Sequence, residues 1–343
     1  MPIQPIAIKS TGLVTSVGLS APAACAAIRA KISNPTETRF MGSDGEWIMA
    51  HQVPLAEPWR GLSKLTKMAA MAIAECLDGI PSADWASIPL LLCVAERERP
   101  GRLDGLDEHL FLDIENELGS TFSPESTIIA AGRVGVAVAL SQARKLIYEG
   151  SKPRVLIAAT DSLLTWPTLN VYEREDRLLT AGNSDGFMPG EAGGALLVGL
   201  PHRETELICP GVGFGFENAH VRSDQPLKAE GLASAIKESL RDAGRTESIL
   251  QFRVTDVSGE QYYFKEASLA FSRLDRTKRK QFDFWHPAEC VGQTGSAIGI
   301  VMLAVLKSAC EKRYAKGDNI LAHVANDNGK RASMILAWHS KRT

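Results

Sequence analysis

Residues Thr127 to Gly150, TIIAAGRVGVAVALSQARKLIYEG, decide the fold of this chain. The stretch opens with small residues, contains Gly132 and Gly135, and is apolar on every side from Val134 to Leu140. A helix that is apolar all round must be buried all round. We therefore expect a helix that begins deep inside the protein.

The amino end of a buried helix is a suitable place for chemistry. Its unpaired N–H groups and the helix dipole favour an anion or a thiolate. Here the first turn carries Gly132, Arg133 and Val134, with neither a cysteine nor a serine. The absence of a nucleophile is the main functional question that this sequence raises.

Length and composition limit the possible domain organisation and partners of the chain. The 343 residues are 45% hydrophobic and 23% charged, as in a well-packed globular protein, and the length predicts two domains or one duplicated unit. A net charge of −2 favours neither nucleic acid nor an anionic membrane as a partner. The longest wholly apolar run, Ile298 to Leu306, is too short to span a membrane, so we expect no membrane insertion.

The N-terminus and the cysteines indicate a cytoplasmic protein. The first residues, MPIQPIAIKS, lack the charged start and apolar core of a secretory signal. The six cysteines are scattered without CxxC or any other metal-binding spacing, which predicts reduced thiols and no metal site. We expect no cofactor.

Two stretches of the chain match each other. The form G-x-x-G-x-A begins at Gly132 and again at Gly292, 160 residues later, where a second all-apolar helix is expected over Gly292–Cys310. This repeat predicts two α/β halves, residues 1–200 and 201–343. Alternating strands and helices predict parallel sheets, with the two buried helices between them.

Shorter segments add detail to this scheme. The apolar run Ile88–Ala95 is typical of a buried parallel strand, and a loop is expected from the end of the strand Arg154–Thr160 through Asp185. Gly211-Val-Gly-Phe-Gly215 predicts a strand that another backbone approaches closely rather than a phosphate loop.

At this point the residues resemble the β-ketoacyl synthase (condensing enzyme) family of the thiolase fold. Three segments carry the resemblance: DGFMPGEAGG at 185–194 looks like the family's D-G-F-x-x-G-E-G-A-G turn, IKSTGLVTSVG at 8–18 is similar to T-G-x-G-x-V-T-x-x-G, and GQTGSAIG at 292–299 is similar to G-H-x-x-G-A-A-G. The resemblance implies a five-layer αβαβα fold and a dimer. It also gives a structural role to Asp185, Gly186, Phe187, Gly190, Glu191 and Gly194.

The resemblance also implies a cysteine at the first buried helix, two histidines or a histidine and an asparagine, and a supporting lysine. None of these is present. Arg133, or Gly132 if the register slips by one, stands at the cysteine position; the 160-residue offset favours Arg133 because it pairs with Gln293, which falls on the second histidine. Ser258 occupies the first histidine position and Ala288 the lysine position. Four changes together indicate that condensation chemistry is lost.

The candidate binding residues are Arg133, Ser258, His286 and Gln293. Arg133 could bind an anion, but a buried arginine more often pairs with a carboxylate such as Asp161, Glu191 or Glu260. Gln293 could meet a ligand carbonyl or satisfy loop backbone. Ser258 would need a base and has only Glu260 nearby, and His286 is more often a hydrogen-bonded core or interface residue than a displaced catalytic one.

Three functions remain open. The first is an inactive condensing-enzyme homologue that acts as a chain-length-factor-like subunit or an accessory scaffold, in a homodimer or paired with a synthase-like subunit. The second is an acyltransferase or acyl-binding protein that acts on acyl carrier protein or coenzyme A thioesters by altered chemistry. The third is an active 3-oxoacyl synthase, which the residues disfavour. The basic run 273–280 could dock an acidic carrier protein, although a solvated loop is the favoured interpretation.

Overall fold

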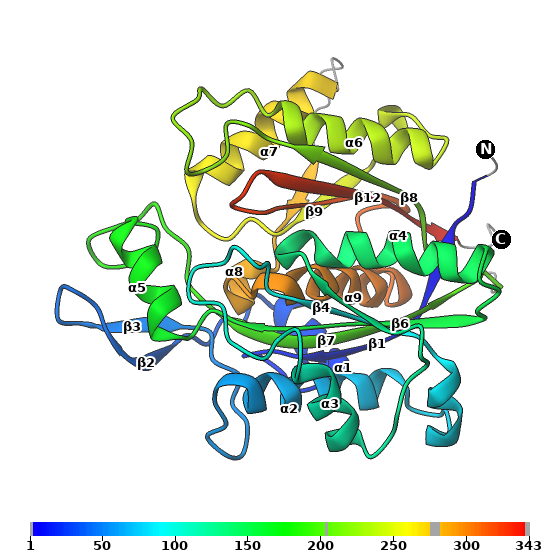
Figure 1. The fold of residues 1–343 in the computed structure, drawn as a ribbon. Coiled ribbons are helices and arrows are strands. Elements are labelled where there is room, and N and C mark those ends of the chain that lie inside the picture. The colour runs from blue at the N-terminus through cyan, green and yellow to red at the C-terminus, as the bar shows by residue number, and fades with distance from the viewer. Residues whose placement is uncertain (1–2, 203–204, 275–281, 340–343) are drawn as a thin grey trace.

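A mixed sheet of ten strands runs through the molecule in the order β10-β9-β11-β12-β8-β1-β7-β6-β4-β5 (Figure 1). The computed structural model describes residues 3–202, 205–274 and 282–339. The ten strands are β1 (Ile6–Val14), β4 (Leu90–Val94), β5 (Thr127–Ala130), β6 (Arg154–Ser162), β7 (Glu191–Gly199), β8 (Glu206–Phe216), β9 (Phe252–Thr255), β10 (Asp283–Trp285), β11 (Asn319–Ala325) and β12 (Lys330–His339). A separate hairpin consists of β2 (Thr36–Met41) and β3 (Trp47–Ala50).

The helices are α1 (Ala21–Arg29), α2 (Gly61–Cys76), α3 (Leu110–Leu118), α4 (Gly135–Tyr148), α5 (Trp166–Arg174), α6 (Glu230–Asp242), α7 (Gln261–Leu274), α8 (Ala288–Val291) and α9 (Ile298–Glu311). Within the described ranges, no helix combines the length and the apolar character needed to cross a bilayer. The helix α5 lies where the sequence predicts a loop, so that prediction is wrong. Thr165 caps α5 and a proline stands in its first turn, a start signal that is visible in the sequence.

The two halves of the sheet have the same connectivity. Outward from the centre, β1-β7-β6-β4-β5 on one side matches β8-β12-β11-β9-β10 on the other. Only residues 6–8 of β1 pair with β8, and this short contact joins the halves into one sheet. The division at residue 200 stays a prediction; it falls between β7 and β8.

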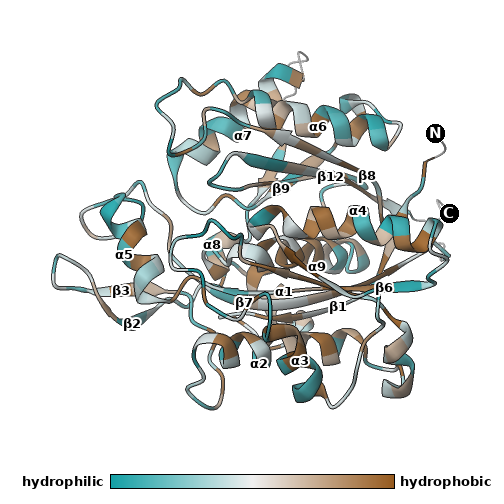
Figure 2. Ribbon diagram, viewed as in Figure 1, coloured by the Kyte–Doolittle hydropathy of each residue, from teal (hydrophilic) through white to brown (hydrophobic). Residues whose placement is uncertain are grey.

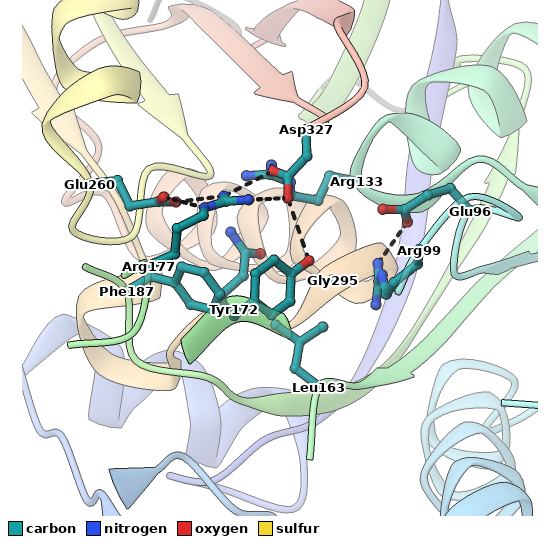
Figure 3. A pocket seen from close by; sticks show the side chains of 11 residues that line it. Glu96, Arg99, Arg133, Leu163, Tyr172, Arg177, Phe187, Glu260, Gly295 and Asp327 are labelled. Carbon is teal, nitrogen blue, oxygen red and sulfur yellow. Dashed lines mark hydrogen bonds and ion pairs between the residues drawn. The ribbon is translucent and has the colours of Figure 1, made fainter. Parts of the chain in front are cut away.

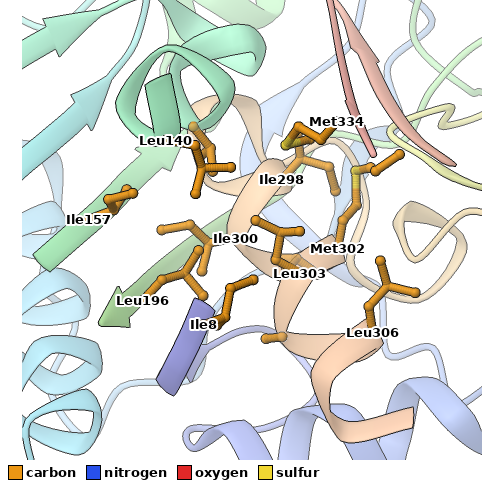
Figure 4. Close-up of a cluster of buried hydrophobic side chains, with 14 of the residues drawn as sticks. Ile8, Leu140, Ile157, Leu196, Ile298, Ile300, Met302, Leu303, Leu306 and Met334 are labelled. Carbon is orange, nitrogen blue, oxygen red and sulfur yellow. The ribbon is translucent and has the colours of Figure 1, made fainter. Parts of the chain in front are cut away.

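The sheet folds over two buried helices. In Figure 1, α6 and α7 cover the half that contains β8 and β12, α2 and α3 cover the half that contains β1 and β7, and α4 and α9 lie between the halves. The five-layer fold class is confirmed. Figure 2 shows hydrophobic residues concentrated in the inner helices and strands, and residues 298–306 of α9 are all buried. Side chains of α4, α9 and both halves meet in one apolar cluster (Figure 4).

The prediction of parallel sheets is only partly right. The strand β4 is parallel to β5 and β6, as expected for Ile88–Ala95, but β7 is antiparallel to both β6 and β1. The other half repeats this mixture. The segment from β6 to β7 contains only the short helix α5, which lies to one side of the sheet in Figure 1, so β7 returns antiparallel beside β6.

The glycines of β8 are required by close packing, as predicted. A Cβ atom at Gly213 would lie 2.2 Å from the carbonyl oxygen of Ala235 in α6, and one at Gly215 would lie 2.1 Å from that of Gly231. Only residues without a side chain allow the backbone of α6 to lie this close to the strand.

The 160-residue register of the repeat is wrong by three residues. Gly132 opens a 3-10 turn before α4 with a φ of +58°, and the residue that opens the matching turn before α9 is Gly295, with a φ of +55°. Gly292 instead ends α8. The repeated G-x-x-G-x-A spacing thus aligned glycines with different roles, and Arg133 corresponds to Ser296 rather than to Gln293.

Candidate functional site

The turn before α4 is packed against Glu96 and hydrogen-bonded to Asn326. A Cβ atom at Gly132 would lie 2.2 Å from a carboxylate oxygen of Glu96. The backbone N–H of Val134 donates to the side-chain oxygen of Asn326 at 3.3 Å, and the amide of Asn326 donates to the carbonyl of Ala131 at 2.9 Å. At the matching turn, the N–H of Ser296 donates to a carboxylate oxygen of Asp161 at 2.7 Å. Each buried helix is therefore capped by a polar side chain from the end of a strand.

Arg133 is buried in an ionic cluster. Its guanidinium donates to Asp327, to Asp256 at 3.4 Å and to the hydroxyl of Tyr263 at 2.8 Å, and lies 4.8 Å from the centre of the Tyr263 ring. Arg133 is thus paired with carboxylates, as expected for a buried arginine, but the residues named as examples, Asp161, Glu191 and Glu260, form no ion pair with it. The anionic partners come from the segments that follow β9 and β11.

A second arginine completes this cluster (Figure 3). Arg177 donates to both carboxylate oxygens of Glu260, at 2.7 and 3.0 Å, and to both of Asp327, at 2.7 and 3.2 Å. Asp327 therefore joins Arg133 to Arg177. Tyr263 also donates its hydroxyl proton to Asp327. Charge-assisted bonds of this bidentate kind are the strong ones in proteins.

Arg99 lies beside this cluster. Its two terminal nitrogens donate to Glu96 at 2.7 Å and to Asp161 at 2.8 Å. Glu96 and Asp161 are the carboxylates that a Cβ atom at Gly132 or Gly295 would strike. Both helix-start turns are thus packed against one arginine-bridged pair of acids.

The electrostatics follow from burial and pairing. Burial alone would raise the pKa of Asp327, but Arg133 and Arg177 hold it far below its usual range. Burial raises the pKa of Asp256 and of Glu260, and the arginines only partly offset that rise. Asp327 is therefore the anion that both arginines share.

The space left inside the cluster is small. The free volume is about 10 Å³ and is lined by Glu96, Arg99, Arg133, Leu163, Tyr172, Arg177, Phe187, Glu260, Gln293, Gly295 and Asp327. That is room for about one water molecule. The side-chain oxygen of Gln293 is buried there without a hydrogen-bond partner in the structure, which a single water would satisfy. The space that the described residues leave at this point is too small for a substrate.

The structure brings some of the candidate residues together. The amide of Gln293 donates to the hydroxyl of Ser258 at 3.2 Å, and Gln293 shares the small cavity with Arg133. Ala288 is buried in α8. His286 lies outside this group. The centre of its ring is 5.8 Å from that of Phe264 and 5.4 Å from that of Phe284.

The residues of the D-G-F motif contact several other segments of the chain. Asp185 accepts from the N–H of Gln261, and Phe187 packs edge-on against Tyr172 at 5.0 Å. Glu191 accepts from the N–H of Val53 and from Lys64 and Ser162. The glycines of the motif allow close approach: a Cβ atom would lie 2.5 Å from Leu178 at Gly186, 2.4 Å from Val291 at Gly190 and 2.6 Å from Ile300 at Gly194.

Several residues of the cluster carry no local motif. Arg177, Asp256, Tyr263 and Asp327 lie in loops, at a strand end or in the first turn of α7, and only their meeting in space defines the site. Tyr263 is buried with this cluster. In the part of the chain that the structure describes, no group of three or more His, Cys, Asp or Glu side chains is placed to hold a metal ion.

No family model matches this sequence, and no curated protein is significantly similar to it. Solved structures match over almost the whole chain. One is a type II PKS acyl-carrier protein in complex with its ketosynthase bound to the hexaketide, AntDE:AntF (TM-score 0.79, 16% identity, 98% of this chain and 100% of that chain). Another is the ishigamide ketosynthase/chain length factor (TM-score 0.80, 17% identity, 98% and 99%).

A third match is the ketosynthase ApeO in complex with its chain length factor ApeC from Xenorhabdus doucetiae, with a TM-score of 0.72, 13% identity and coverage of 98% of both chains. This chain has the ketosynthase fold. The fold inferred from the D-G-F motif is therefore confirmed, while identities this low say nothing about activity. Residues 275–280 of the basic run lie outside the described residues, so the carrier-docking hypothesis stays untested.

Proposed function

We propose that this chain is a ketosynthase-like protein without condensing activity, which acts by binding, as a chain-length-factor-like subunit or an accessory scaffold. One observation carries the proposal. The turn before α4 contains Gly132 and Arg133, whose guanidinium is fixed by buried ion pairs, and it lies beside a cavity of about 10 Å³. A thioester and a second acyl group need far more room than one water molecule.

The cysteines support the same conclusion. All six are buried, and burial raises the pKa of every one of them, for Cys290 to about 11. The thiolate is the form that attacks a thioester. Each thiol is therefore held in its unreactive form, including Cys290, the thiol nearest to Gly292 in the sequence.

Gly132 is the better match to the nucleophile position. The register that favoured Arg133 is wrong, and Gly132 is the residue that opens the turn before the buried helix. A side chain at Gly132 would enter the space of the Glu96 carboxylate. Glu96 therefore closes the position from which a nucleophile would act.

Intact-mass spectrometry tests the proposal. After incubation with an acyl-CoA thioester or with acylated acyl carrier protein, we expect the unmodified mass. A stoichiometric acyl adduct would overturn the proposal, and loss of that adduct in Ser258→Ala would assign the nucleophile to Ser258. Gly132→Cys is expected to give no condensation product, because Ser258 and Gln293 still occupy the histidine positions and the Glu96 carboxylate fills the space of the new side chain.

We also propose that the chain pairs with a second chain of the same fold, either a copy of itself or a synthase-like subunit. The strand β5 ends the sheet order, and no described strand pairs with its outer edge. An open edge strand is a template for pairing with another chain. In sedimentation equilibrium, a homodimer would give twice the chain mass of 37.1 kDa. A monomer would exclude the homodimer and leave the pairing with a synthase-like subunit.

A further inference from the structure

A cleft of about 520 Å³ lies between the β2–β3 hairpin, the start of α2 and the start of α5. Figure 1 shows the hairpin and α5 projecting together beside the body of the protein. This volume falls in the usual range for small-molecule sites. The cleft contains neither arginine of the ionic cluster, so an inference about it stands independently of the proposed function.

The charge of the cleft is positive. Its lining includes Arg39, Arg60 and Lys64 and a single carboxylate, Glu191. Glu191 is already neutralised by Lys64 and also accepts from Ser162 at 2.9 Å. In residues 3–202, 205–274 and 282–339, neither Arg39 nor Arg60 has an ion-pair partner. Two guanidinium groups are thus left for an anion from outside.

Two other clefts differ in this respect. One, of about 570 Å³, is lined by Arg97 against Asp107 and Glu115. The other, of about 490 Å³, is lined by four carboxylates and two arginines, and both of these arginines are already paired with carboxylates. Neither of them presents unpaired positive charge beside a flat apolar wall.

The apolar wall of the first cleft is aromatic. Trp59 and Trp166 are 36% and 45% exposed, although tryptophan usually buries most of its large ring. Trp166 stacks on Phe40 with ring centres 6.3 Å apart, and the guanidinium of Arg39 lies 5.0 Å from the centre of the Phe40 ring. Exposed rings beside guanidinium groups suit a flat partner that is charged at one end.

The start of α2 faces the same cleft. Gly61, the first residue of this 16-residue helix, is part of the lining, and the side chain of its N-cap residue, Arg60, makes no capping hydrogen bond. Open N–H groups and the positive end of the helix dipole add to the attraction for an anion.

We propose that this cleft binds a small organic anion that carries a planar ring. Its carboxylate or phosphate lies toward Arg60 and Arg39, and its ring lies against Trp59 and Trp166. Guanidinium groups bind carboxylate and phosphate with similar two-point geometry, so both anions belong to the expected class.

Isothermal titration calorimetry of the full chain tests this with four probes. We expect saturable binding of 2-naphthoate and 2-naphthyl phosphate, and binding at least about tenfold weaker for uncharged 2-naphthylmethanol and for ringless cyclohexanecarboxylate. If only one of the two anions binds, that result identifies the anion of the natural ligand class.

Matched variants localise the binding. Arg60→Gln and Trp166→Leu are each expected to weaken binding of 2-naphthoate by about fivefold or more. Arg241→Gln and Trp47→Leu, which change exposed residues outside the cleft, are expected to leave it unchanged. Absence of saturable binding up to about 1 mM of either anion, or equal effects of the cleft and control variants, would overturn the proposal.

Discussion

Replacing Asp327 with asparagine is expected to lower the free energy of unfolding by about 3–5 kcal/mol. The buried Asp327 carboxylate accepts from Arg133, Arg177 and Tyr263, so its loss leaves two buried cations without their shared anion. Removing one partner of a buried ion pair costs far more than the pair contributes, because the remaining charge stays desolvated. Arg177 keeps Glu260, and Arg133 keeps only the longer contact to Asp256 at 3.4 Å.

Urea unfolding followed by tryptophan fluorescence measures this change. Glu311→Gln is the matched control, because its partner Lys307 is one helical turn away and the Glu311 side chain is about half exposed. We expect the control to change stability by no more than about 0.5 kcal/mol. A loss below about 1 kcal/mol in Asp327→Asn would show that the arginines are satisfied without Asp327.

The cluster connects segments that are far apart in the sequence. Arg133 precedes α4, Arg177 follows α5, Glu260 precedes α7 and Asp327 follows β11. In an enzyme these segments would need to surround a substrate. Here they are bonded to one another, and this supports the proposal that the protein acts by binding rather than by condensation at this position.

The fold was accessible from the sequence because its strongest signals are local. The all-apolar residues 134–140 and 298–306 predict helices buried on every side, and the glycine pattern of β8 predicts that another backbone approaches closely. These predictions need only residues a few positions apart.

The site was not accessible in the same way. That Arg133 needs an anionic partner follows from burial alone, but the choice of Asp327 and Asp256 depends on where β9 and β11 end relative to α4. A register error of three residues in the repeat was enough to misplace the comparison with Gln293. Sequence spacing can propose which residues of the two halves correspond. Here the positive φ angles of Gly132 and Gly295 showed that these two glycines are the corresponding pair.

Stability is expected to fall by about 4 kcal/mol between pH 8 and pH 5 through two buried histidines, His323 and His51. Burial lowers the pKa of His323 to about 3, with Arg253 and Arg331 adding to the effect, and lowers that of His51 to about 4. In the unfolded chain both residues titrate near pH 6.5. The unfolded state therefore binds protons that the folded state does not, and stability is lost as the pH falls below about 6.5.

Variants separate the histidines from the carboxylates of the ionic cluster. Asp256 and Glu260, whose pKa values are raised by burial, act in the opposite direction, so a wild-type profile alone would mix the two effects. Comparison of His323→Gln with the parent protein cancels them. We expect the variant to lose about 2 kcal/mol less than the parent between pH 8 and pH 5 in urea unfolding. Equal slopes for His323→Gln and the parent protein would show that His323 takes up a proton in the folded state.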